Sequence, residues 1–123
     1  MVRYAETDKM GVAYYANYFV WFEVGRCELL RALGGSYRDL EAQGVMLPVI
    51  EAYCQFKDSA RYDDELEIAT TGSLLSPARV EFRYDVARRA DHTQLAAGKT
   101  VHAAVDLDGR PCRLPASIRT VLT

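Results

Sequence analysis

Apolar and polar residues alternate along much of the second half of the chain. Over residues 80–86 the sequence V-E-F-R-Y-D-V alternates strictly. This period of two is typical of a strand in an antiparallel sheet with one face buried. Segments of similar texture, rich in Val, Ile, Tyr, Phe and Thr, cover residues 46–57, 65–75, 79–90 and 94–107. They predict four strands, and the short connections, such as Ser76-Pro77, favour antiparallel pairing.

The pattern changes to a helical period in the first third of the chain. Apolar positions recur every three or four residues over 16–33, which predicts an amphipathic helix that ends at Gly34-Gly35. The apolar stripe contains Tyr18, Phe22, Gly25, Leu29 and Leu33. We expect the charged side chains on the remaining surface of the helix: Glu23, Arg26, Glu28 and Arg31. Further apolar residues widen the stripe, which indicates a helix well covered by a sheet.

Shorter elements complete the predicted fold. Residues 2–6 read as a short strand, 36–41 as a capped helix, 108–109 as a hairpin turn and 115–122 as a terminal helix. We therefore predict an α+β fold in which a five-stranded antiparallel sheet wraps around one long central helix. A single domain would span residues 1–123. Long strands in a small domain leave edges to protect, which favours dimerisation through edge pairing.

Composition excludes several classes of protein. Half of the 123 residues are hydrophobic and 26% are charged, so the chain should fold. The net charge of −2 and the lack of a dense basic tract argue against a nucleic-acid partner. Apolar runs fall short of the roughly 20 residues that span a bilayer. Residues 1–4 lack the apolar core of a signal peptide, so we expect a cytoplasmic location. The three cysteines are far apart and form no C-x-x-C pair, so we predict no metal site.

The candidate chemistry lies just ahead of the predicted helix, in residues 6–18. This segment places the carboxylate of Asp8 before Gly11 and a run of aromatic residues. A helix start has unpaired backbone N–H groups and a positive dipole end, and it can stabilise a developing oxyanion. Structural roles are also open: Asp8 could cap a turn, Gly11 could serve a turn, and Asn17 could cap the helix.

Four sequence segments together carry a resemblance to a known family. They are R-Y-A-E-T-D-x-x-G-V-x-Y-Y-A-N-Y over residues 3–18, A-R-Y-D-D-E-L over 60–66, H-A-A-V-D over 102–106 and G-R-P over 109–111. The chain resembles the 4-hydroxybenzoyl-CoA thioesterase family of the hotdog fold. It is most similar to the branch of small bacterial acyl-CoA thioesterases associated with the Tol-Pal envelope system. The resemblance covers nearly the whole chain.

The resemblance implies hydrolysis of acyl-CoA thioesters without a metal or a redox cofactor, at sites shared between protomers of a homodimer or homotetramer. The family's catalytic carboxylate falls on Asp8, and its oxyanion donor falls on the backbone N–H of Tyr15. Gly11 would let the thioester approach. The Tol-Pal-associated branch commonly has histidine where this chain, like the 4-hydroxybenzoyl-CoA enzyme, has a tyrosine (Tyr15), so the resemblance assigns no role to the tyrosine side chain.

The residues leave several points of the chemistry open. Asp8 could attack the thioester carbonyl directly or activate a water molecule. Tyr14 and Asn17 are candidates for contacting the substrate, and Arg61, Arg88 and Arg89 for meeting the CoA phosphates. Two other functions also remain. One is a non-catalytic acyl-CoA-binding or envelope scaffold protein. The other is a hotdog dehydratase, which would want a histidine and an acid near the helix.

Overall fold

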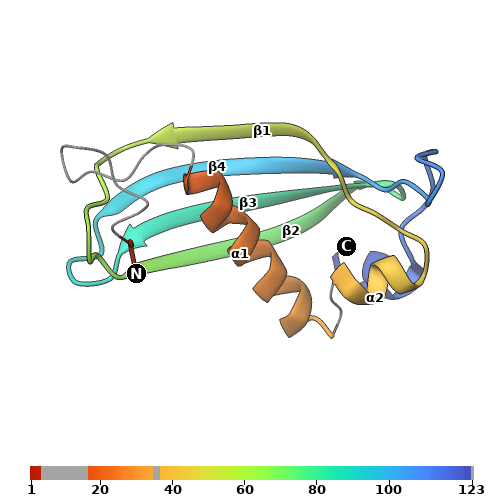
Figure 1. Cartoon of the computed structure of the whole chain (residues 1–123), viewed down its shortest axis with the longest axis horizontal. Coiled ribbons are helices and arrows are strands. Elements are labelled where there is room, and N and C mark those ends of the chain that lie inside the picture. Colours follow the sequence, from red (N-terminus) through yellow and green to blue (C-terminus); the bar gives the residue numbers. More distant parts are fainter. Residues whose placement is uncertain (4–16, 35–36, 123) are drawn as a thin grey trace.

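The computed structural model of the chain describes residues 1–3, 17–34 and 37–122. The sheet contains β1 (Val49–Phe56), β2 (Leu66–Ser76), β3 (Arg79–Arg88) and β4 (Gln94–Ala103). All neighbours pair antiparallel, in the order β1-β4-β3-β2. The helices are α1 (Asn17–Ala32), α2 (Tyr37–Ala42) and α3 (Ala116–Leu122). The helices and strands predicted within residues 17–34 and 37–122 are confirmed, with bounds close to those expected (Figure 1).

The expected five-stranded sheet around a long central helix is not what the described residues form. Their sheet has four strands, and α1 packs chiefly against β2 on one face of it (Figure 1). The helix has 16 residues and is about 24 Å long. The 11-residue β2 is about 36 Å long, so α1 covers only part of the length of the sheet. Residues 2 and 3 of the expected first strand are described but are not part of a strand, and residues 4–6 lie outside the described residues.

Local signals explain where these elements start and end. Gly34 follows α1 with a φ of 88°, a conformation that glycine adopts at little cost, and its N–H bonds to the carbonyl of Arg31. β1 begins directly after Pro48, a residue that cannot donate to the ladder. Gly109 turns with a φ of 79° between the bridged Val105 and Pro111, which confirms the predicted turn at residues 108–109.

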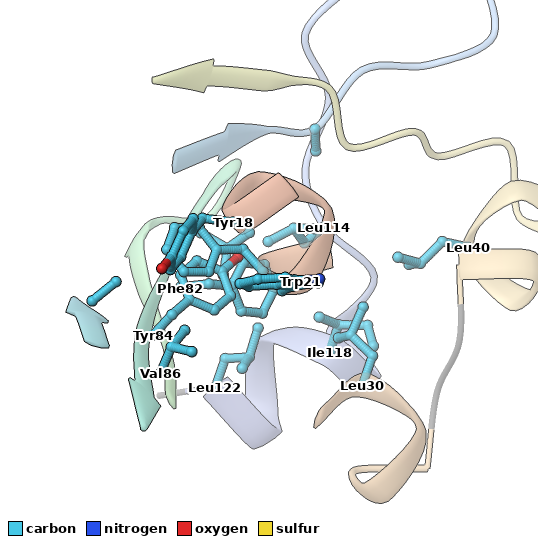
Figure 2. Packing of buried hydrophobic residues seen from close by; sticks show 14 of the residues in the cluster. Tyr18, Trp21, Leu30, Leu40, Phe82, Tyr84, Val86, Leu114, Ile118 and Leu122 are labelled. Carbon is cyan, nitrogen blue, oxygen red and sulfur yellow. The ribbon is translucent and has the colours of Figure 1, made fainter. Parts of the chain in front are cut away.

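The core lies between α1 and the covered face of the sheet. The ring of Phe22 stacks on Tyr84 at 4.3 Å with an interplanar angle of 4°. It also lies so close to Gly98 that a Cβ built there would be 2.6 Å from the ring. Figure 2 shows Tyr18, Phe82 and Tyr84 gathered at one end of this core, with Leu30 and Ile118 toward the other. Large side chains thus fix the position of α1 on the sheet.

Candidate active site

Tyr18 joins the first turn of α1 to the segment that follows β1. Its buried ring packs edge-on against Phe56 at 5.0 Å, and its hydroxyl is hydrogen-bonded to the backbone of Ala60. Burial raises the pKa of Tyr18, so its hydroxyl stays protonated at neutral pH. The start of the helix therefore packs against the loop over residues 57–65.

Arg88 ties this loop together. Its Nε donates to Asp64 Oδ2 at 3.3 Å, its Nη1 to Asp91 Oδ2 at 3.0 Å and its Nη2 to the carbonyl of Ser59 at 3.0 Å. The backbone N–H of Arg61 also donates to Asp64 Oδ2 at 2.9 Å. Hydrogen bonds to the two carboxylates raise the pKa of Arg88 above its ordinary value. Asp64 is therefore an anchor for two arginines.

The predicted site residues divide into three groups. Asp8, Gly11, Tyr14 and Tyr15 lie outside the described residues. Asn17 is the first residue of α1, and Tyr18 and Asp64 bring Arg61 and Arg88 to the same end of that helix. Arg89 instead lies 3.8 Å from both Glu65 and Glu67, at the start of β2. The roles predicted for all of these residues stay predictions.

A network of hydrogen-bonded polar side chains crosses the core, and the sequence did not predict it. Arg26 is hydrogen-bonded to the hydroxyl of Tyr84, and that hydroxyl lies 2.6 Å from Thr100 Oγ1. Thr100 Oγ1 lies 2.9 Å from His102 Nε2, and His102 Nδ1 lies 2.9 Å from the carbonyl of Leu47. The carbonyl can only accept, so Nδ1 carries the proton of a neutral imidazole. Each hydroxyl in this network then donates its hydrogen bond to the next group away from Arg26.

Arg26 corrects one expectation from the helical pattern. The helical pattern predicts Arg26 on the outer surface of the helix, but its side chain is only 9% exposed. Phe22, Arg26 and Leu30 are four residues apart, so they lie on one side of α1, and this spacing could have revealed the burial. A buried guanidinium needs hydrogen-bond acceptors, and the oxygen of Tyr84 supplies one.

His102 should make stability depend on pH. Burial lowers its pKa, and the nearby charge of Arg26 lowers it further. The unfolded chain, with an ordinary histidine pKa of about 6.5, then binds a proton that the native state resists. The free energy of unfolding should therefore fall as pH drops below about 6.5, by up to about 1.4 kcal/mol per unit of lowered pKa.

The test compares the wild type with His102→Asn, which keeps an N–H donor for Leu47 but cannot take up the proton. Urea unfolding at pH 7.5 and pH 5.0 should show a larger loss of stability in the wild type. An equal loss in the two proteins would mean that other groups carry the acid sensitivity.

Comparison with known families decides what kind of protein has this architecture. A family model described as the thioesterase-like superfamily matches residues 2–122. The chain belongs to this superfamily. The acyl-CoA thioester hydrolase YbgC of Escherichia coli is 33% identical to this thioesterase-like chain over 118 residues, covering 95% of the chain and 87% of YbgC.

Solved structures agree with this membership. A DHNA-CoA thioesterase from Staphylococcus aureus superposes with a TM-score of 0.87 at 36% identity, covering 92% of this chain and 76% of that one. A hypothetical protein, TT1821 from Thermus thermophilus, gives a TM-score of 0.90 at 38% identity, covering 98% and 92%. The fold is therefore the hotdog fold of thioesterases, with an α+β architecture and an antiparallel sheet.

Two further observations concern only the part of the chain that the structure describes. Among residues 1–3, 17–34 and 37–122, no three histidine, cysteine or acidic side chains gather as metal ligands would. Within the same ranges, no helix has both the length and the apolar character needed to cross a bilayer.

Proposed function

We propose that this protein hydrolyses acyl-CoA thioesters to the free acid and CoA. The observation that carries the proposal is the 33% identity to an acyl-CoA thioester hydrolase over 95% of the chain. The alternatives of a scaffold protein and a dehydratase have no comparable support. The structure adds a helix that begins directly after the segment holding Asp8 and Tyr15.

The proposed mechanism uses one carboxylate and one oxyanion site. Asp8, ionised at neutral pH, attacks the carbonyl carbon or takes a proton from an attacking water molecule. The backbone N–H of Tyr15, two residues before α1, stabilises the oxyanion as the C–S bond breaks, and Gly11 leaves room for the thioester. CoA departs as a thiolate and takes a proton from solvent. In the direct route, water then hydrolyses the acyl anhydride on Asp8.

Substrate recognition extends this proposal to Tyr14, Asn17 and the arginines. Arg61 and Arg88 lie at the same end of α1 as the proposed oxyanion site, which supports a role in meeting the CoA phosphates. Three contacts already hold the guanidinium of Arg88, so its contribution is largely to position the loop. The exposed side chain of Arg61 is then the better candidate for direct contact.

The test is release of free thiol from acetyl-, decanoyl- and benzoyl-CoA. Release above the rate of spontaneous hydrolysis supports the proposal. Tight binding by calorimetry with no release would instead favour a binding or scaffold protein. Hydration of an enoyl-CoA would favour a dehydratase.

We further infer a homodimer formed through β1. This strand is an edge of the sheet, and its exposed apolar side chains include Ile50, Tyr53 and Phe56. Lys57 donates to Leu95 across the ladder, so the alternation of an antiparallel pair turns the N–H of Ala52 toward the open edge. Such an edge is a template for a second strand.

Ala52→Pro should therefore disrupt the dimer. It removes an outward N–H and places a ring on the open edge, while the ladder to β4 stays intact. Sedimentation should show monomers for Ala52→Pro and dimers for the wild type and for Ala52→Ser, which keeps the N–H. A dimer that persists in a folded Ala52→Pro protein would place the interface elsewhere.

Three finer assignments complete the proposal. Membership in the Tol-Pal-associated branch, near the 4-hydroxybenzoyl-CoA enzymes, is supported by the segments over residues 3–18, 60–66, 102–106 and 109–111. A single domain over residues 1–123 is supported by the family match over 2–122. A cytoplasmic location completes the proposal, because acyl-CoA thioesters, the proposed substrates, are intracellular metabolites.

A further inference from the structure

A groove runs along α1, from the outward side of the helix to the segment that precedes β1. One cavity, of about 470 Å³, is lined mainly by apolar residues of the segment before β1 together with Arg26 and Cys27 of α1. A second, of about 340 Å³, is lined by residues of α1 from Val20 to Arg31. The two cavities share Glu23 and Cys27, so they form one continuous depression, the α1 groove. Its volume is in the range of small-molecule sites.

Exposed apolar side chains line the α1 groove. Val20 is 48% exposed, Val24 48% and Met46 47%. Val20, Val24 and Cys27 are spaced as one stripe along the helix. Apolar residues grouped at a hollow in this way mark a surface that a ligand or a partner covers.

The far wall of the groove is held in place by hydrogen bonds. Met46 and Val105 exchange two backbone hydrogen bonds, of 2.8 and 2.9 Å. His102 fixes the carbonyl of the next residue, Leu47, from inside the core. The wall of the groove is therefore held in one position before any ligand binds.

Charge decides which part of an acyl-CoA suits this groove. Glu23 and Glu41 line the larger cavity beside one arginine, Arg26, and Glu23 and Glu28 line the smaller one beside Arg31. Each cavity thus has two carboxylates against one guanidinium, and this net negative charge disfavours the phosphates of CoA and any acidic end of an acyl group. Arg61 and Arg88, the candidates for the phosphates, lie instead at the start of α1. The groove thus suits the neutral hydrocarbon end of the substrate.

Length sets the size of that hydrocarbon. Cys27 follows Asn17 by ten residues, a distance of about 15 Å along the helix. A carbon–carbon bond of about 1.5 Å advances an extended alkyl chain by about 1.25 Å. A chain that starts at the proposed thioester site would therefore reach the larger cavity with about 8 to 12 carbons.

We propose that the α1 groove binds the alkyl chain of a straight-chain acyl-CoA of about 8 to 12 carbons. This inference rests on the proposed function and names the substrate class of the same site. An aromatic acyl group would end near Val20 and leave most of the groove empty.

The first test measures kcat/KM for butyryl-, octanoyl-, decanoyl- and benzoyl-CoA. We expect decanoyl-CoA to exceed butyryl-CoA at least tenfold in the wild type. Cys27→Trp fills the groove and should reduce this ratio at least tenfold, and Val24→Glu should reduce it in the same direction. Leu75→Trp, on the opposite side of the sheet, should keep the wild-type ratio. A ratio that stays at the wild-type value in both groove variants would overturn the inference, as would a wild-type preference for benzoyl-CoA.

The second test does not depend on turnover. Decyl-CoA, a thioether that cannot be hydrolysed, should slow alkylation of Cys27 by iodoacetamide at least fivefold, as read by peptide mass spectrometry. Cys112, which packs against the core, is the internal control and should react at its original rate. If Cys27 gains no protection, the groove is not the alkyl site, even if thiol release confirms hydrolysis. If no acyl-CoA is hydrolysed, protection of Cys27 would still place the alkyl chain in a binding protein.

Discussion

Asp8→Asn should lower kcat for acyl-CoA hydrolysis by about 10³-fold, within the range expected when a positioned acid–base or nucleophilic group is lost. The amide keeps the shape of the side chain but neither attacks a carbonyl nor accepts a proton from water. Binding of decyl-CoA should survive, because the amide removes no apolar contact. The measurement is thiol release under saturating substrate, with the melting temperature recorded for each protein.

Glu6→Gln is the matched control for this experiment. It removes a carboxylate two residues away in the same segment, one that we expect to be solvated. It should therefore change kcat by less than threefold, a bound set by the ordinary small effect of surface substitutions. Turnover that survives in a folded Asp8→Asn protein would show that another group acts as the catalytic carboxylate.

Gly98→Ala should be among the most destabilising single substitutions in the described part of the chain. A Cβ at this position would lie 2.5 Å from the backbone oxygen of Tyr53 and 2.6 Å from the ring of Phe22. Neither neighbour is the free end of a flexible side chain, so the strand or the helix must shift. Overpacking of this kind costs about 1–3 kcal/mol or more, which urea unfolding would measure.

Ala97→Val provides the comparison, because residue 97 is next along β4 and its side chain points to the uncovered face of the sheet. It adds more volume than Gly98→Ala but meets no helix, so its effect should stay below about 0.5 kcal/mol. If Gly98→Ala were equally mild, α1 would have to move away from β4 without loss of packing.

The sequence predicted the elements better than their arrangement. Strict alternation over residues 80–86 and the apolar stripe of α1 identify elements because each records which side of its own backbone is buried. Neither pattern records how far a sheet curls around a helix. The four-stranded sheet of the described residues and the one-sided position of α1 depend on contacts between elements, which periodicity does not contain.

For the candidate site too, local features could be predicted from the sequence, and contacts between elements could not. A local segment carries the case for Asp8 and Tyr15, because their proposed chemistry needs only a carboxylate placed before a helix start. The hydrogen-bonded network from Arg26 to His102 instead depends on the register of the strands. Thr100 is opposite Phe82, and Tyr84 is opposite Gly98, so the bond between Tyr84 and Thr100 runs diagonally across the sheet. No motif in the sequence encodes that diagonal.

The fit of Phe22 into the space above Gly98 has a consequence for catalysis. The ring fixes the position of α1 along the helix axis. Phe22 lies five residues after the helix start at Asn17. Adding one residue between Asn17 and Phe22 would turn the helix start by about 100° and displace it by about 1.5 Å. The enzyme would keep its sheet and its groove, but the proposed oxyanion donor would be displaced from the substrate. The number of residues between Phe22 and the helix start thus sets where the proposed oxyanion donor lies.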